Sequence, residues 1–247
     1  MILVKMGGSV ITNKDKPLSA RRASIQKITT ALKKIKDPLV IVHGGGSFGH
    51  YWSVKFDMHT KPARYDPRGV ATVKNSMVYL NKIILDSFLK CNLNPYCLPP
   101  TDFMSKNKPI RSKILEIEKM AKSHLVPVTF GDALWFGNKK SFILSGDKIM
   151  SILASYLKPR LSIFLLNVDG LYSDLNSKDL IYNVGNQSPK ISSTNLDVTG
   201  GMLRKLEEAN KISRMGHTVF FVNGNKPERM ISAVKRKKFE GTLFRGK

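Results

Sequence analysis

The stretch HGGGSFGH, from His43 to His50, follows an apolar and mostly β-branched run, Leu39 to Val42. Three consecutive glycines after a strand leave bare backbone N–H groups that can approach a phosphate closely. A helix starting just beyond this loop would add its positive N-terminal end. The loop ends in His50, whose imidazole can bond a phosphate oxygen or exchange a proton near neutral pH. The stretch therefore predicts a strand that leads into an anion-binding turn.

Two further glycine turns occur in the chain. KMGGS, from Lys5 to Ser9, follows the first apolar run, and DVTGGMLRK, from Asp197 to Lys205, opens an expected helix. In the latter, Thr199 to Gly201 offer backbone donors, and Lys205 lies about one helical turn further on. The turns KMGGS and HGGGSFGH at strand ends indicate an enzyme that handles two phosphorylated molecules. The GxxxxGK[ST] P-loop and the protein-kinase motifs HRD and DFG do not occur, which excludes those two classes of phosphoryl transfer.

Helical and strand-like patterns alternate along the whole chain, without an internal repeat or a low-complexity linker. This alternation predicts an α/β fold, in which an open and mostly parallel sheet is sandwiched between helices. Ligands of such sheets bind outside the carboxyl ends of the strands. The expected strands and apolar runs are 1–6, 39–42, 96–98, 126–130, 142–144, 162–167, 218–222 and 241–244, and the expected helices are 21–36, 70–89, 114–123, 149–157 and 201–215.

The chain has 247 residues, 42% of them apolar, which suits one large α/β domain with a full core. No apolar run is long enough to cross a bilayer, and the N-terminal residues do not resemble a secretory signal. Cys91 and Cys97 fit neither a disulfide framework nor a metal motif, so we expect both to be buried small residues in a reducing cytoplasm. The net charge of +23 permits anionic partners, but we expect it to reflect a lysine-rich solvated surface and no specific nucleic-acid partner.

Two lysines are candidates for contacting phosphates. Lys5 immediately precedes the first glycine turn, where an ammonium group can reach the outer phosphates of a nucleotide; the alternative is a solvated strand lysine. Lys14 lies in the polar loop ITNKDK and is unremarkable by itself. The remaining histidines, His59, His124 and His217, have no partner at metal or triad spacing and are expected to be surface or core residues.

Two carboxylates follow apolar runs. Asp147 in SGDKI and Asp169 in NVDGLY could orient a lysine, bond a ribose or hold Mg²⁺ indirectly. Alternatively they cap helices, and Asp147 in particular precedes a helical run as an N-cap residue would. Tyr172, two residues after Gly170, could line a nucleotide pocket or serve as a core aromatic residue.

Taken in order, these motifs resemble the amino acid kinase family. The match runs almost end to end, from KMGGSVIT through HGGGSFGH, VTFGD, SGDKI, FLLNVDGLYS and DVTGGMLRK to VNGNKPERM and FEGTLFR. Within the family, His50 and the run NGNKPER followed by GTLFR are similar to the archaeal-type branch that acts on isopentenyl phosphate. The resemblance implies a single three-layer αβα domain, 1–247, that forms a homodimer. Residues of about 1–140 would bind the acceptor substrate and residues of about 141–247 would bind ATP.

The resemblance also implies an activity and a set of roles. The expected reaction is the Mg²⁺- and ATP-dependent phosphorylation of isopentenyl phosphate to isopentenyl diphosphate, an isoprenoid precursor of a mevalonate-type pathway. Lys5, Lys14 and His50 would be catalytic. The acceptor would be bound by Gly44, Gly45, Gly49, His50 and Gly131; ATP would be bound by Lys5, Gly7, Gly8, Ser9, Gly46, Asp147, Asp169, Gly170, Tyr172, Gly200, Gly201 and Lys205. No protein ligand is expected for the Mg²⁺, which ATP phosphates would carry.

Phosphoryl transfer mainly requires positioning and charge neutralisation, which lysines and glycine N–H groups can supply. An isoprenoid acceptor also needs an apolar slot beside its phosphate. Val73, Met77, Ile83, Ile84 and Phe88 could form that slot, or could simply pack in the core.

One departure from the pattern and two rival functions stay open. Relatives commonly have SGDD where this chain has SGDK, so Lys148 could neutralise ATP or point to solvent. The first rival is a kinase of the same fold acting on a phosphonate, an amino acid or a nucleotide. The second is a noncatalytic anion- or RNA-binding protein.

Overall fold

The computed structural model describes residues 1–13, 15–58, 65–105, 107–135, 137–173, 179–184 and 200–246. Its central sheet has eight strands in the order β10-β12-β11-β9-β1-β2-β6-β3. All neighbouring pairs in this sheet are parallel except β11 with β12. The strands are β1 (Ile2–Met6), β2 (Leu39–His43), β3 (Pro95–Cys97), β6 (Val126–Phe130), β9 (Leu161–Leu166), β10 (Asn183–Val184), β11 (Val219–Asn223) and β12 (Thr242–Phe244).

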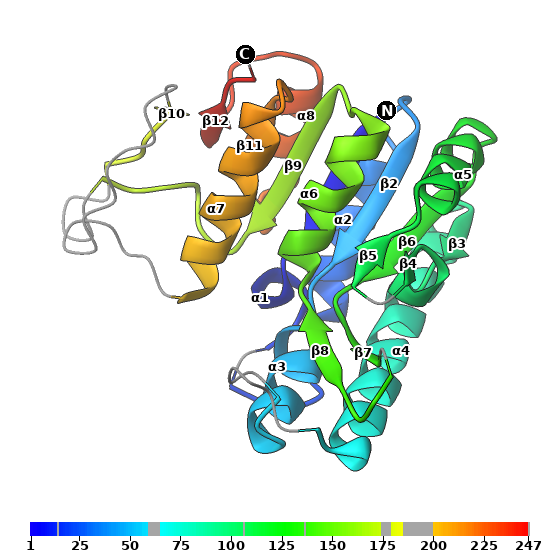
Figure 1. The fold of residues 1–247 in the computed structure, drawn as a ribbon. Helices are drawn as coiled ribbons and strands as arrows, with labels where there is room; N and C mark the ends of the chain where they lie inside the picture. Colours follow the sequence, from blue (N-terminus) through cyan, green and yellow to red (C-terminus); the bar gives the residue numbers. More distant parts are fainter. Residues whose placement is uncertain are drawn as a thin grey trace.

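Helices cover both faces of this sheet (Figure 1). One face carries α2 (Arg22–Leu32), α4 (Pro67–Lys90) and α8 (Glu228–Val234); the other carries α5 (Arg111–Lys122), α6 (Gly146–Leu157) and α7 (Gly200–Arg214). Each face has its own core of buried apolar side chains. Because side chains alternate along a strand, Ile2, Val4 and Met6 of β1 pack in the first core, whereas Leu3 packs in the second. The predicted three-layer α/β fold is thereby confirmed.

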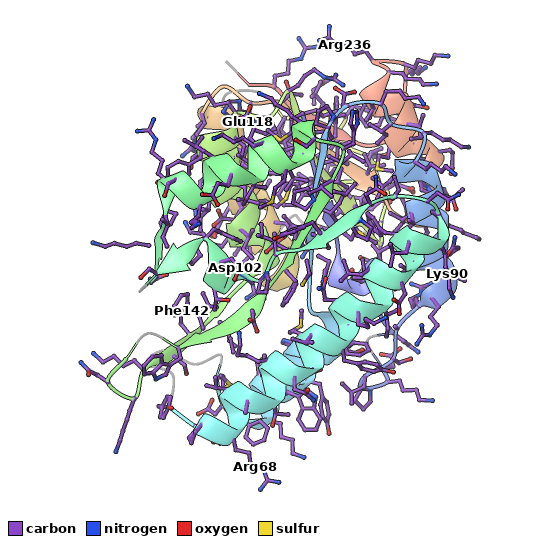
Figure 2. All side chains as sticks on the ribbon, turned by 90° about the vertical axis from the view of Figure 1, so that its right-hand side faces the viewer. Arg68, Lys90, Asp102, Glu118, Phe142 and Arg236 are labelled. Atoms are coloured by element: carbon purple, nitrogen blue, oxygen red, sulfur yellow. The ribbon has the colours of Figure 1, made fainter. Side chains whose placement is uncertain are left out.

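Short elements extend the carboxyl edge of the sheet, at the lower end in Figure 1. They include α1 (Gly8–Ile11), α3 (Gly46–Lys55) and the hairpin of β7 (Asp132–Trp135) and β8 (Ser141–Leu144). Figure 2 shows α4 crossing the molecule from Arg68 to Lys90, with Arg68 at this same lower end and Arg236 at the opposite end. The remaining elements are η1 (Pro100–Asp102) and the hairpin of β4 (Met104–Ser105) and β5 (Lys108–Pro109).

Several local predictions were wrong. The helix after the second glycine turn begins inside the motif, at Gly46, so His50 lies within α3 instead of closing a loop. Helix α2 ends at Leu32, earlier than the predicted Lys36. Cys91 is buried as predicted, but Cys97 at the end of β3 is exposed. No helix among the described residues is long and apolar enough to traverse a membrane.

Candidate active site

The glycine turns gather at one edge because the strands that precede them are parallel. Residues Met6, His43, Phe130 and Leu166 are the last residues of β1, β2, β6 and β9, which are neighbours in the sheet. The turns that follow these strands therefore lie side by side. Strand β1 is the topological switch point of the sheet. It pairs with β2, the next strand along the chain, on one side and with the much later β9 on the other.

The first two glycine turns touch backbone to backbone. A side-chain carbon at Gly8 would lie 2.5 Å from the nitrogen of Gly46, and one at Gly44 would lie 2.9 Å from the nitrogen of Gly8. Gly46 has a φ of +47°, and a side chain there would also collide with the Thr12 hydroxyl. Glycine is thus required at these contacts. The Thr12 hydroxyl joins the turns, since it donates to the Gly8 carbonyl (2.7 Å) and accepts from the Ser47 N–H (3.0 Å).

Lys5 is a buried cation and not the solvated strand lysine of the alternative interpretation. Its side chain points to the face that also holds Leu3, where α6 begins, and its exposed fraction is 2%. The ammonium lies 2.9 Å from Asp147 Oδ1, and Lys205 Nζ of α7 lies 3.8 Å from Asp147 Oδ2. Lys205 also donates to the Gly201 carbonyl (2.9 Å) in the first turn of α7, which begins at Gly200. The Asp147 carboxylate of α6 thus pairs with lysines from β1 and α7, two elements distant in sequence.

Asp147 does not cap α6. The cap is Ser145, whose hydroxyl accepts from the Lys148 N–H at 3.1 Å, so Asp147 keeps its carboxylate for the two lysines. Burial by itself would raise the pKa of Asp147, but Lys5 and Lys205 outweigh burial and hold the pKa below its ordinary value. Lys148 is exposed on the first turn of α6.

The turn after β6 closes the site from another side. A side-chain carbon at Gly131 would lie 2.9 Å from the nitrogen of Gly146 at the start of α6. The next residue, Asp132, is buried and forms an ion pair with Lys74 of α4. Burial raises the pKa of Asp132, although Lys74 opposes that shift. The motif VTFGD gives no sign of this pair, because no local pattern connects Asp132 to α4.

Two of the predicted acceptor glycines, Gly45 and Gly49, face α4. Met77 Sδ would lie 3.0 Å from a side-chain carbon at Gly45 and 3.1 Å from one at Gly49. His50 is exposed on α3, one residue beyond Gly49. The five residues considered for an apolar slot (Val73, Met77, Ile83, Ile84 and Phe88) all belong to the core cluster on this face. Of these, Met77 is the one whose contact with the glycine turn is established.

Asp169 lies in a network of its own. It accepts from Asn223 Nδ2 (2.9 Å), pairs with Arg229, which also pairs with Glu240, and lies 3.6 Å from Lys226. Burial would raise the pKa of Asp169, but these partners lower it overall. The motif NGNKPER contains Asn223, Lys226 and Arg229, so the signal for this network was present in the sequence.

The remaining nucleotide-side candidates lie around the ends of β1 and β9. Tyr172 is half-buried with its hydroxyl 3.4 Å from Asp169, and Gly170 packs against Thr242 of β12. Ser9 donates to Asn167 (3.1 Å), and the Gly7 N–H donates to the Leu165 carbonyl (3.1 Å). These contacts link the first glycine turn to β9.

Some predicted residues lie outside the described ranges: Lys14, His59 and the stretch Asp197 to Thr199. Of the other histidines, His124 is exposed and His217 is half-buried. Within the described residues, no group of three or more histidine, cysteine, aspartate or glutamate side chains could hold a metal ion.

Comparison with known proteins identifies the family. The sequence model described as the amino acid kinase family matches residues 1–223. The chain belongs to this family. The isopentenyl phosphate kinase of Thermoplasma acidophilum is 33% identical, with 99% of this chain and 100% of that protein covered. The isopentenyl phosphate kinase of Methanocaldococcus jannaschii is 29% identical over 95% of both chains.

Among solved structures, the product complex of the Thermoplasma acidophilum isopentenyl phosphate kinase matches with a TM-score of 0.83 and 30% identity, over 99% of this chain and 100% of that one. In this member of the family, carbons placed at Gly146 and Gly201 would lie 3.3 Å from Lys5 and 3.8 Å from Lys205, so glycines border the cluster of Lys5, Asp147 and Lys205.

Removing the Asp147 carboxylate should destabilise the fold in a pH-dependent way. We expect Asp147→Asn to lower the free energy of unfolding at pH 7 by about 3 kcal/mol, since it leaves the buried ammonium group of Lys5 without its counterion and removes the partner of the half-buried Lys205. Because the pKa of Asp147 is lowered in the folded state, its contribution is present above about pH 3.9 and is lost as the pH falls through the folded-state value. The difference between the two proteins should therefore shrink below about pH 4, as measured by urea unfolding.

Asp86→Asn is the matched control, because Asp86 pairs with Lys82 on the exposed surface of α4. Its cost should stay below about 0.5 kcal/mol. Equal losses for the two variants, or a difference that persists undiminished in acid, would show that the buried cluster does not depend on Asp147.

Proposed function

We propose that this chain is an ATP-dependent kinase that converts isopentenyl phosphate to isopentenyl diphosphate. The observation that carries the proposal is full-length similarity to two isopentenyl phosphate kinases. The geometry supports it independently, since two glycine turns in backbone contact lie beside a lysine cluster at the carboxyl edge of the sheet. Such an arrangement suits two anions that must be brought together.

On the nucleotide side, ammonium groups and backbone N–H groups hold the ATP phosphates. We assign Lys5 and Lys205 to the phosphates, with Asp147 as the carboxylate that orients both lysines. The other nucleotide contacts are assigned to Gly7, Gly8, Ser9, Gly46, Asp169, Gly170, Tyr172, Gly200 and Gly201. Asp169 also holds the loop after β9 in place, because Arg229 and Asn223 bind its carboxylate.

On the acceptor side, we assign the phosphate of isopentenyl phosphate to Gly44, Gly45, Gly49 and Gly131 together with His50. The exposed imidazole of His50 can donate a charge-assisted hydrogen bond to that phosphate. Met77, whose sulfur lies against Gly45 and Gly49, forms the apolar wall where the isoprenoid tail begins. Lys14 neutralises the group in transfer.

Transfer is direct and in line. An oxygen of isopentenyl phosphate forms a bond to the γ-phosphorus of ATP, while the bond between that phosphorus and the bridging oxygen breaks and its electron pair leaves with ADP. The attacking oxygen is already anionic, so no strong base is needed. The protein instead offsets the charge that gathers at the transferring group, through Lys5, Lys14 and the glycine N–H groups.

Magnesium fits this scheme only as a cation bound to ATP. Both Asp147 oxygens face ammonium groups, and the described residues contain no cluster of ligands for a metal ion. When bound with ATP, Mg²⁺ would neutralise phosphate charge. We assign it no protein ligand.

The N-terminal part, about 1–140, is proposed to bind the acceptor and the part from about 141 to 247 to bind ATP.

We also propose a cytoplasmic homodimer. Tyr51 and Val54 of α3 and Val78 and Tyr79 of α4 are exposed by 42 to 56%, and the rings of Phe48 and Tyr79 connect the two helices. This apolar face suits a second copy of the chain.

Purified protein should convert isopentenyl phosphate to the diphosphate with ATP and Mg²⁺, at a kcat/KM far above that for glutamate, aspartate, UMP or a phosphonate antibiotic. Coupled ADP release and phosphorus NMR of the product measure this. Equal or better turnover of another acceptor would assign the chain to a different kinase activity. Steeply salt-dependent RNA binding without any kinase activity would favour an anion-binding protein instead.

His50→Ala should lower kcat/KM for isopentenyl phosphate about 100-fold or more, the effect of removing one donor to a developing anion. His124→Ala is the control, since His124 is also exposed but follows α5 at the opposite end of the sheet. Steady-state kinetics compare the two variants. Near-full activity of His50→Ala would exclude His50 from the mechanism.

Sedimentation equilibrium should give twice the chain mass of 27.7 kDa, and Tyr79→Arg should shift the mass toward that of one chain. An unchanged dimer in Tyr79→Arg would place the contact between copies elsewhere. A monomeric wild type would contradict the proposed homodimer.

A further inference from the structure

The first histidine of HGGGSFGH has no part in the proposed chemistry. His43 is the last residue of β2, its exposed fraction is 0%, and its ring stacks on Phe130 with centroids 5.2 Å apart. An enclosed ring cannot touch a substrate. Burial lowers the pKa of His43 from 6.5 to about 4, so the imidazole is neutral at physiological pH. A neutral imidazole has one N–H and one bare nitrogen, and both nitrogens have polar neighbours.

The neighbours of the ring decide which nitrogen carries the proton. Nδ1 lies 3.2 Å from the carbonyl oxygen of Gly44, which can only accept. Nε2 lies 3.2 Å from the Asn81 amide of α4, and the other end of that amide lies 3.2 Å from the Cys97 thiol. If the amide oxygen faces Nε2, both ring nitrogens face acceptor oxygens, and only a doubly protonated ring could bond to both. A neutral ring would leave one of its nitrogens with a lone pair directed at an oxygen lone pair.

A half-turn of the Asn81 amide, which preserves its shape, satisfies every group. The Cys97 S–H then donates to the amide oxygen, the amide N–H donates to Nε2, and Nδ1–H donates to the Gly44 carbonyl. Although Cys97 as a whole is exposed, partial burial of its thiol raises the pKa, which keeps the proton available for this bond. The chain of hydrogen bonds thus runs in one direction, from β3 through α4 to the second glycine turn.

The end of this chain is a peptide plane of the candidate active site. The peptide that joins Gly44 to Gly45 is planar, so its C=O and its N–H point in opposite directions. Anchoring the Gly44 carbonyl therefore aims the Gly45 N–H away from His43. Glycine backbones have the greatest conformational freedom, so a turn of three glycines gains most from such an anchor.

We propose that His43 and Asn81 are positioning residues, which aim the Gly45 N–H at the phosphate of the acceptor substrate through a hydrogen-bond chain that begins at Cys97. This inference rests on the proposed function for the identity of that acceptor. It specifies one tautomer of His43, protonated on Nδ1, and one orientation of the Asn81 amide.

The tautomer can be measured without any activity. In wild-type protein labelled with ¹⁵N-histidine, long-range ¹H–¹⁵N correlation spectra at pH 7 should show His43 protonated on Nδ1 and bare on Nε2, with the signal assigned by its loss in a His43 variant. A proton on Nε2, or a ring that titrates near pH 6.5, would overturn the proposal. This readout stands whether or not isopentenyl phosphate is the substrate.

Two substitutions separate positioning from packing. An asparagine amide can occupy the place of Nδ1, whereas a glutamine amide reaches the place of Nε2. His43→Asn should therefore keep the KM for isopentenyl phosphate within about threefold, and His43→Gln should raise it about tenfold, the effect of one lost hydrogen bond. The KM for ATP should be unchanged in both. A purely packing role predicts the reverse order, because glutamine is closer to histidine in volume.

Asn81→Leu, which preserves shape and removes both hydrogen bonds, should also raise the acceptor KM about tenfold. Ser87→Ala is its control, since Ser87 is a buried polar residue of α4 that bonds to Gln26 and Thr29 of α2. Equal KM values for all variants of an active kinase would overturn this inference and leave the proposed function standing. If the wild type does not use isopentenyl phosphate, the proposed function is wrong. The NMR measurement of the His43 tautomer then still tests the hydrogen-bond chain.

Discussion

A buried ammonium group organises this structure. Lys5 lies on β1, an interior strand of the sheet whose four remaining side chains are all apolar. A buried ammonium group in such surroundings needs a counterion. Asp147 satisfies this need, and because it lies in the first turn of α6, the ion pair fixes the start of that helix against the end of β1. Lys205 then connects α7 to the same carboxylate. The positions of two helices thus depend on one charge.

The glycine turns impose a second constraint, which is steric. Because Gly8 and Gly46 approach within the space that a side chain would need, the ends of β1 and β2 present backbone only. The two turns therefore approach each other more closely than side chains at these positions would allow. For a reaction between two anions, this closeness matters more than the number of donors, since each anion can be held while its neighbour is within bonding reach.

The parts of this arrangement that could be predicted from the sequence are those with local signals. Alternating patterns predicted the layers, and glycines after apolar runs predicted turns at the carboxyl edge. The start of α3 was missed because it involves a distant residue: Thr12, directly after α1, accepts from the Ser47 N–H, and Gly46 adopts a left-handed conformation beside it. The role of Asp147 was left open because its partners lie far away in sequence. Ser145, which carries the capping signal, lies only two residues earlier. Cys97 was expected in the core, yet β3 is one of the two edge strands of the sheet, and Cys97 is exposed there.

Asp147 and Asp169, the two carboxylates proposed for the nucleotide side, differ in the charge of their surroundings. Asp169 is surrounded by Arg229, Lys226 and Asn223, and Arg229 has Glu240 as a second partner, so this network is nearly neutral and holds loops together. Asp147 has one charge against the two of Lys5 and Lys205, which leaves the cluster with one net positive charge. A surplus cation in a largely buried place is unfavourable until an anion arrives. This imbalance supports the proposal that the cluster binds a negatively charged ligand, because a purely structural ion pair would gain nothing from an extra positive charge.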